Sequence, residues 1–155
     1  MSRPEVLDDG VALAGSPATE PVLAVKDFSL TFKAGAETNL VESVSFSVSP
    51  GKTLCIVGES GCGKSVTSLA LMGLLPSPPA RIVSGTAAFN GRNLFAMPER
   101  ARADLRGNEM AMIFQEPMTS LNPAFTVGHQ IAEGIMRHRD VSKAQARAEA
   151  LKMLE

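Results

Sequence analysis

Alternating apolar and polar residues predict a β-rich first half of the chain. Between residues 43 and 49, Val44, Phe46 and Val48 alternate with serines, which is the two-residue period of a strand with one buried face. The segment 53–57 is instead apolar almost throughout, as in a strand buried on both faces of a sheet. A strand at 82–89 would end at an Asn-Gly pair, which favours a tight turn. The expected strands are 22–32, 43–49, 53–57, 82–89 and 109–114.

Apolar residues at helical spacing predict helices between and after these strands. They recur in this way from 66 to 74, and Pro76 marks the end of that helix because proline cannot continue the hydrogen-bond ladder. Further helices are expected at 98–105, at 126–137 and from 142 onward. The last of these would open with a capping box formed by Ser142 and Gln145. The pattern as a whole predicts an α/β fold.

Composition and charge narrow the classes of function. The 155 residues carry 15 basic and 16 acidic side chains, a net charge of -1, so the charge balance does not favour nucleic acid as a partner. No window reaches the roughly 18 apolar residues of a membrane-spanning helix, and the start of the chain lacks the pattern of an export signal. We therefore expect a cytosolic protein with two cysteine thiols and with a disordered leader at 1–20.

A glycine-rich segment joins the apolar run to the first predicted helix. Residues 58–65 fit the phosphate-loop pattern G-x-x-x-x-G-K-[ST], in the strand-to-helix context that this pattern requires. Glycines let the backbone bend so that successive N–H groups point at phosphate oxygens, and the start of the helix adds positive potential. The alternative is a glycine-rich turn that only connects a strand to a helix. The nucleotide-binding residues expected here are Gly58, Glu59, Ser60, Gly61, Cys62, Gly63, Lys64, Ser65 and Val66.

Two side chains of this loop have chemistry of their own. Lys64 would act as a catalytic residue that reaches the β- and γ-phosphates, and the hydroxyl of Ser65 would ligate Mg²⁺. Cys62 occupies a variable position, where we interpret it as a tolerated small residue because the backbone contacts the phosphate. The loop predicts binding of a nucleotide with Mg²⁺, and by itself it leaves kinases, GTPases and motor ATPases open.

A second motif narrows the class of protein. Residues 112–123 read Met-Ile-Phe-Gln-Glu-Pro-Met-Thr-Ser-Leu-Asn-Pro and resemble the Q-loop segment of ABC transporter ATPases, in the form found in the oligopeptide, dipeptide and glutathione importer branch. The resemblance extends over 22–155. It implies a P-loop NTPase of the ABC type, with an antiparallel β subdomain and an incomplete RecA-like parallel sheet within 21–123. The helical subdomain would begin within 124–155.

The resemblance also implies roles for two residues outside the phosphate loop. Gln115 would be the catalytic glutamine that senses the γ-phosphate through Mg²⁺ and the attacking water, and the loop after it would contact the membrane subunit. The simpler interpretation is a polar residue that closes a strand. Phe32 would stack on the adenine of ATP, with a core or strand-end aromatic as the alternative.

Three further parts of such an ATPase do not follow Gln115 in this sequence. They are the Walker B carboxylates at the end of a second buried strand, a signature of the Leu-Ser-Gly-Gly type, and the switch histidine. We therefore expect a truncated domain that is inactive in turnover by itself even where it binds nucleotide.

The resemblance implies the energy-coupling ATP-binding subunit of an importer for peptides or related small substrates, in which hydrolysis by the complete protein drives transport. It would lie at the cytoplasmic side of the cell membrane. Its partners would be membrane permease subunits, a second ATP-binding domain and, indirectly, an external substrate-binding protein. Two alternatives stay open: a non-catalytic fragment with residual nucleotide binding at most, and a soluble ABC protein of nucleic-acid repair or translation, which the charge balance disfavours.

Overall fold

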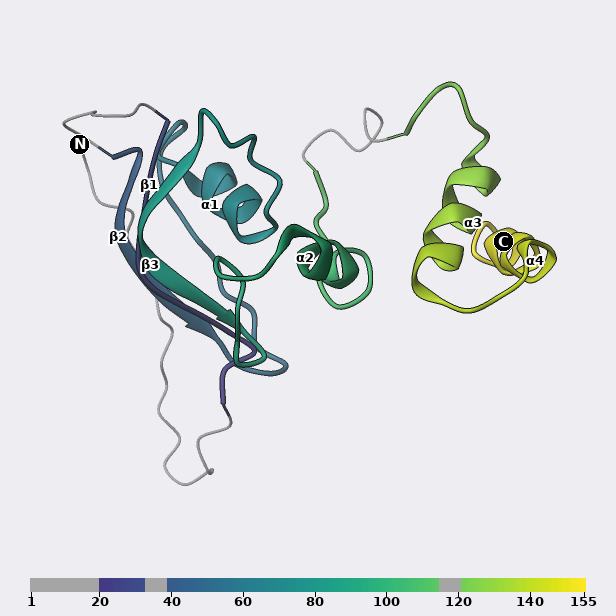
Figure 1. The fold of residues 1–155 in the computed structure, drawn as a ribbon, viewed down its shortest axis with the longest axis horizontal. Coiled ribbons are helices and arrows are strands. Elements are labelled where there is room, and N and C mark those ends of the chain that lie inside the picture. Colours follow the sequence, from purple (N-terminus) through teal and green to yellow (C-terminus); the bar gives the residue numbers. More distant parts are fainter. Residues whose placement is uncertain (1–19, 33–38, 115–120) are drawn as a thin grey trace. The chain divides into compact units, whose positions relative to one another are not determined.

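A four-stranded antiparallel sheet forms most of the first of two compact units, which extends to Glu99 (Figure 1). The structure is a computed structural model, and it describes residues 20–32, 39–114 and 121–155. The strands are β1 (Leu23–Thr31), β2 (Val41–Val48), β3 (Arg81–Phe89) and β4 (Arg92–Asn93), in the order β2-β1-β3-β4. The strands expected at 22–32, 43–49 and 82–89 are confirmed.

The local sequence signals of this sheet are reproduced in detail. In β2, Val44, Phe46 and Val48 are half-buried, whereas the serines between them are exposed. The tight turn expected after β3 joins it to β4, and Asn90 and Gly91 have φ angles of 46° and 75°. Two successive positive φ angles match the right-handed twist of the flanking strands, which is why an Asn-Gly pair is favoured there.

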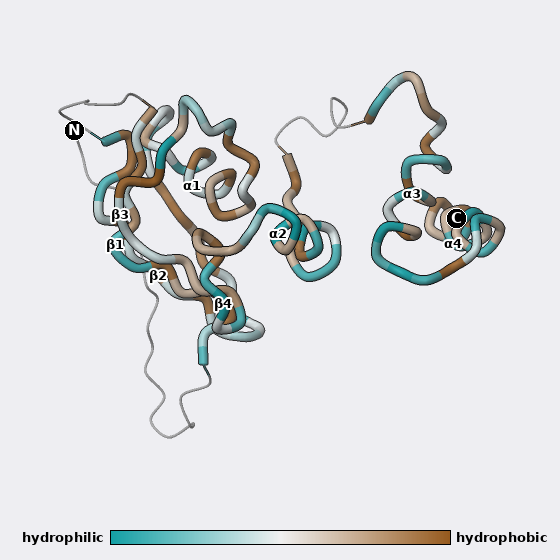
Figure 2. Tube along the Cα trace, in the orientation of Figure 1, coloured by the Kyte–Doolittle hydropathy of each residue, from teal (hydrophilic) through white to brown (hydrophobic). Residues whose placement is uncertain are grey.

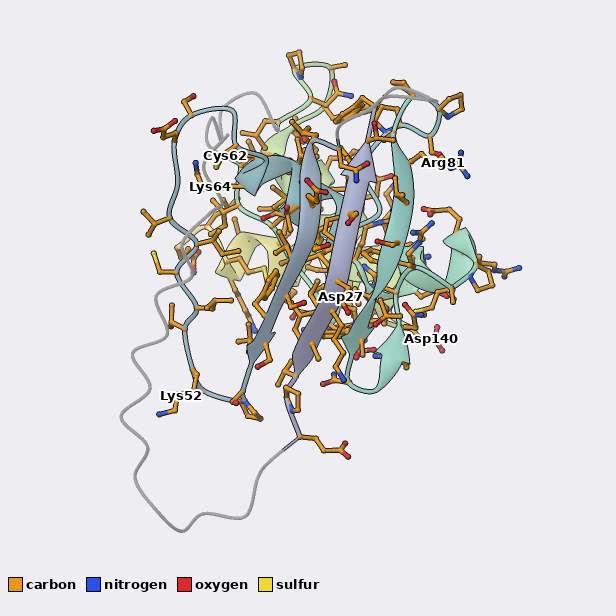
Figure 3. All side chains as sticks on the ribbon, turned by 90° about the vertical axis from the view of Figure 1, so that its left-hand side faces the viewer. Asp27, Lys52, Cys62, Lys64, Arg81 and Asp140 are labelled. Carbon is orange, nitrogen blue, oxygen red and sulfur yellow. The ribbon has the colours of Figure 1, made fainter. Side chains whose placement is uncertain are left out.

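An irregularity in the middle of β1 determines the register of the sheet. Pairing with both β2 and β3 shifts around Asp27, which has a φ of 49° and lies mid-sheet (Figure 3). Its backbone groups are satisfied by serine side chains: its N–H donates to Ser45 Oγ at 2.8 Å, and its carbonyl accepts from Ser84 Oγ at 3.0 Å. Beyond the bulge, Phe28 and the three residues that follow it are all buried.

The core of this unit forms around the buried half of β1. The largest fully buried side chains are Phe28, Leu30, Leu94 and Val25. The ring of Phe28 lies 5.2 Å from that of Phe95, centroid to centroid. Helix α1 (Lys64–Leu71) lies on one face of the sheet (Figure 1) and buries Thr67, Ala70 and Leu71.

Within the described residues, the strands expected at 53–57 and 109–114 do not form, and these two predictions were wrong. Ile56 in the first segment and Met110 in the second make only isolated bridges. Such apolar segments need a neighbouring strand on each side, and every named strand of the described part of the chain pairs within the antiparallel sheet. Ile113 is consequently 92% exposed. Figure 2 shows the first segment, between β2 and α1, as a hydrophobic stretch.

The second compact unit begins at Arg100 and is helical. Its helices are α2 (Glu99–Leu105), α3 (Val127–His138) and α4 (Lys143–Lys152), and α2 starts one residue before the boundary of the unit. Four residues, Ala132, Ile135, Ala146 and Ala150, form the buried core of α3 and α4. The expected capping box is present: Ser142 Oγ accepts from Gln145 N at 3.3 Å, and Gln145 Oε1 accepts from Ser142 N at 2.9 Å. Among the described helices, none has the length and apolar character needed to cross a membrane.

Replacing Gly85 with alanine is expected to destabilise the sheet. Gly85 has a φ of 94°, and a Cβ there would lie 2.6 Å from the carbonyl oxygens of Lys26 and Asp27 and from the Cα of Phe28. These are backbone atoms that cannot move aside, so we expect a loss of about 2 to 4 kcal/mol in a denaturant titration. Gly51→Ala is the matched control, because Gly51 has a φ of 69° but no atom within 4 Å of an added Cβ. An equal effect of both substitutions would contradict the close backbone approach at the bulge.

Candidate functional site

The glycine-rich segment 58–65 forms a bent loop that runs into α1. The N–H of Cys62 donates to the carbonyl of Glu59 at 3.3 Å, which closes a turn inside the loop. Gly61 and Gly63 have φ angles of 84° and 96°, in the left-handed region that glycine adopts without strain. Gly63 is the N-cap of α1. The loop therefore brings its two ends close together instead of running extended.

The side chain of Lys64 holds the loop closed through hydrogen bonds to two backbone carbonyl groups. Its ammonium donates to the carbonyl oxygens of Gly58 at 2.6 Å and Glu59 at 2.7 Å. Among the described residues, its third contact is Cys62 Sγ at 3.4 Å, and a thiol sulfur is a weak acceptor. A phosphate oxygen would be a far stronger acceptor for this third N–H. The lysine thus closes the loop and still has a donor for an anion, next to Cys62 (Figure 3).

The packing inside the loop explains why its first residue, Gly58, is a glycine. A Cβ on Gly58 would lie 2.7 Å from Cys62 Sγ and 3.9 Å from Lys64 Nζ. The thiol therefore occupies the space that any side chain at Gly58 would need. Cys62 is a free, half-buried thiol, as expected, and Cys55 is free and exposed.

The start of α1 favours an anion at the loop. The first N–H groups of a helix have no partner inside the helix, and they carry its positive partial charge. In α1 these groups belong to Lys64, Ser65 and Val66, and no acidic side chain lies in the first turn to compete for them. Ser65 is exposed and Val66 is half-buried. The start of α1 thus offers both N–H donors and a hydroxyl to a ligand.

A pocket of about 440 Å³ lies between this loop and the beginning of β2. Its walls include Lys64 and residues 59–63 on one side and residues 39–44 on the other, with Ile56 and Thr67 completing the lining. No motif in the sequence marks residues 39–44 as part of a site. Their place beside the loop depends on packing between segments that are distant in the sequence, which a local pattern does not reveal.

The two predicted site residues outside the loop, Phe32 and Gln115, are not found with the loop residues in the described structure. Phe32 directly follows β1, is 37% exposed, and is not among the residues that line the pocket. Gln115 lies outside the residues that the structure describes. The structure therefore brings together the loop residues of the predicted site.

Comparison with known proteins identifies the family to which this chain belongs. The model of the ABC transporter family matches residues 41–155. Because this match covers most of the chain, the chain belongs to the ABC transporter family. The expected ABC-type fold class and the resemblance to the peptide and glutathione importer branch are thereby confirmed.

Three relatives illustrate the similarity. The peptidoglycan transport ATP-binding protein YejF of Agrobacterium fabrum is 46% identical over 137 residues, which are 88% of this chain and 25% of the relative. The oligopeptide transport ATP-binding protein OppD of Bacillus subtilis is 46% identical over 135 residues, 86% of this chain and 38% of the relative. The glutathione import ATP-binding protein GsiA of Pectobacterium atrosepticum is 49% identical over 140 residues, 86% of this chain and 22% of the relative. The chain thus spans less than half the length of these relatives.

A solved structure also aligns with the chain. It is described as the ATP binding subunit of an ABC transporter, and it matches with a TM-score of 0.45 and 22% identity over 80% of this chain and 45% of its own. The family assignment does not rest on this alignment.

The packing of Gly58 against Cys62 predicts a substitution and its rescue. Gly58→Ala is expected to weaken ATP binding several-fold, because the new methyl group displaces a thiol that touches Lys64. Adding Cys62→Ala to the same chain removes the sulfur and should restore affinity to within about twofold of Cys62→Ala alone. The measurement is an ATP titration followed by calorimetry. Strictly additive effects of the two substitutions would show that the thiol is not what excludes a side chain at Gly58.

Proposed function

We propose that this chain binds ATP with Mg²⁺ at residues 58–65, as the energy-coupling ATP-binding part of an importer for peptides or related small substrates. The observation that carries the proposal is the ammonium of Lys64, which closes the loop at the first turn of α1 and has one donor without a strong acceptor among residues 20–32, 39–114 and 121–155. Membership of the ABC transporter family favours a nucleotide over a simple anion. The names of the relatives support the substrate class.

Each part of the loop has a role in this proposal. Backbone N–H groups of the loop and of the first turn of α1 bind phosphate oxygens, and Lys64 reaches the β- and γ-phosphates. The exposed hydroxyl of Ser65 is suited to Mg²⁺ because hard cations prefer oxygen ligands. Among the described residues, no group of three or more His, Cys, Asp or Glu could hold a metal. In a Mg²⁺–ATP complex, phosphate oxygens and water would supply further oxygen ligands, with Gln115 as the further protein ligand that the resemblance implies.

Two further residues of the proposed site would contact the adenine base and respond to hydrolysis of the γ-phosphate. Phe32 is 37% exposed directly after β1, which leaves part of its surface accessible for stacking on adenine. The role of Gln115 as the γ-phosphate sensor is carried over from the resemblance.

In the whole protein, two such domains would close around two ATP molecules. Their opening after hydrolysis would drive the permease subunits between their two states.

Removal of the ammonium is the direct test of ATP binding. Lys64→Ala is expected to weaken ATP binding on the order of tenfold to a hundredfold, because it removes a charged hydrogen bond to phosphate and the clasp on the loop. Lys52→Ala is the matched control, since Lys52 is exposed and lies at the other end of the sheet (Figure 3). Calorimetry on the wild type and both variants measures the affinities. Equal ATP affinity of all three chains would contradict the proposed site.

Modification of Cys62 is expected to block ATP binding. Its Sγ lies 3.4 Å from Lys64 Nζ, so an alkyl adduct would occupy the space beside the ammonium. The experiment uses iodoacetamide on a Cys55→Ser chain, which leaves Cys62 as the one reactive thiol. ATP affinity should be lost after modification, and prior addition of ATP with Mg²⁺ should slow the reaction. A Cys62→Ala control should be insensitive to the reagent, and unchanged affinity after complete modification would oppose the proposal.

A further inference from the structure

The last glycine of the phosphate loop contacts a side chain that the loop motif does not include. Val41, the first residue of β2, is 4% exposed. A Cβ built on Gly63 would lie 2.8 Å from Val41 Cγ2 and 3.4 Å from the carbonyl oxygen of Leu40. The methyl group of Val41 therefore packs directly against the bare Cα of Gly63. This contact connects the antiparallel sheet to the residue that precedes Lys64.

The start of β2 is itself firmly fixed in the sheet. The N–H of Leu40 donates to the carbonyl of Leu30 at 2.9 Å, and Val41 is the register partner of Leu30, which is 1% exposed. Further along β2, the N–H of Ser43 donates to Ser29 Oγ, also at 2.9 Å. The side chain of Val41 thus projects from backbone that has little freedom to move.

On its other side, Gly63 is held by the helix that it caps. The N–H and the hydroxyl of Thr67 both donate to the Gly63 carbonyl, at 2.8 Å and 2.9 Å, and Thr67 is 5% exposed. The carbonyl of Gly63 is thus hydrogen-bonded, and its φ is 96°. The position of Gly63 therefore sets the direction of the backbone at Lys64. Apart from the chain neighbours of Gly63, Val41 is the one residue in the described part of the chain whose side chain lies within 4 Å of the built Cβ.

We propose that Val41 is a positioning residue of the phosphate loop. Its methyl group determines the distance between the sheet and Gly63, and thereby places the Lys64 ammonium and the first N–H groups of α1 on the phosphates. The inference rests on the proposed ATP binding and adds a residue outside the motif. The contact is a van der Waals one, so it depends on the shape of the side chain and is lost steeply when a gap opens.

The test separates shape from stability with three substitutions in the full chain. Val41→Ala removes the methyl groups and is expected to weaken ATP binding about fivefold or more. Val41→Thr keeps the shape but buries a hydroxyl, so it should lower the melting temperature while ATP affinity stays within about twofold of wild type. Val25→Ala is the control for stability alone, because Val25 is 1% exposed in β1 and does not line the pocket. It should lower the melting temperature without weakening ATP binding to the folded chain.

Each outcome of this experiment is decisive. Wild-type ATP affinity in Val41→Ala, or equal losses in Val41→Ala and Val25→Ala, would overturn the positioning role. If Val41→Ala does not fold, Val41→Leu replaces it: this side chain is apolar but differently branched, and wild-type affinity there would equally overturn the inference. Absence of ATP binding in the wild type, with Lys64→Ala indistinguishable from it, would instead overturn the proposed function.

Discussion

The hydrogen bonds from the Lys64 ammonium to the carbonyl oxygens of Gly58 and Glu59 are the interaction on which the site depends. They hold the beginning of the loop against the beginning of α1 and fix the cation between them. Two carbonyl acceptors orient an ammonium without neutralising it, so it keeps its charge for the phosphate that we propose as its ligand. A loop held in this way is prepared for its ligand, which reduces the ordering cost of binding.

The glycines of the loop follow from this closure. Once the lysine draws the ends together, Cys62 Sγ fills the space beside Gly58, and Val41 fills the space beside Gly63. Side chains at either position would push the loop open. The positive φ angles of Gly61 and Gly63 are a second requirement, because a residue with a side chain rarely adopts such angles without strain. Steric room and backbone conformation thus select glycine at different positions for different reasons.

The sheet contributes to the site through its irregularity. The bulge at Asp27 shifts the pairing of β1 with both neighbours and so determines which part of β2 lies opposite Leu30. Val41 takes that place, and its side chain contacts Gly63. The serine side chains at Ser45 and Ser84 satisfy the backbone of the bulge, which allows this register to persist. A feature in the middle of the sheet is in this way connected to the geometry of the phosphate loop.

Local signals in the sequence determined the parts of this protein that depend on neighbouring residues along the chain. The alternation in β2, the Asn-Gly turn, the Ser142 capping box and the strand-to-helix position of the loop all rest on interactions within a few residues. The segments 53–57 and 109–114 have equally clear strand patterns, yet apolar strands of this kind require partners from elsewhere in the chain. Tertiary structure alone decided that these two do not form strands in the described residues, that residues 39–44 line the pocket, and that Val41 meets Gly63. These features depend on contacts between distant segments, and a pattern read along the sequence carries no record of such contacts.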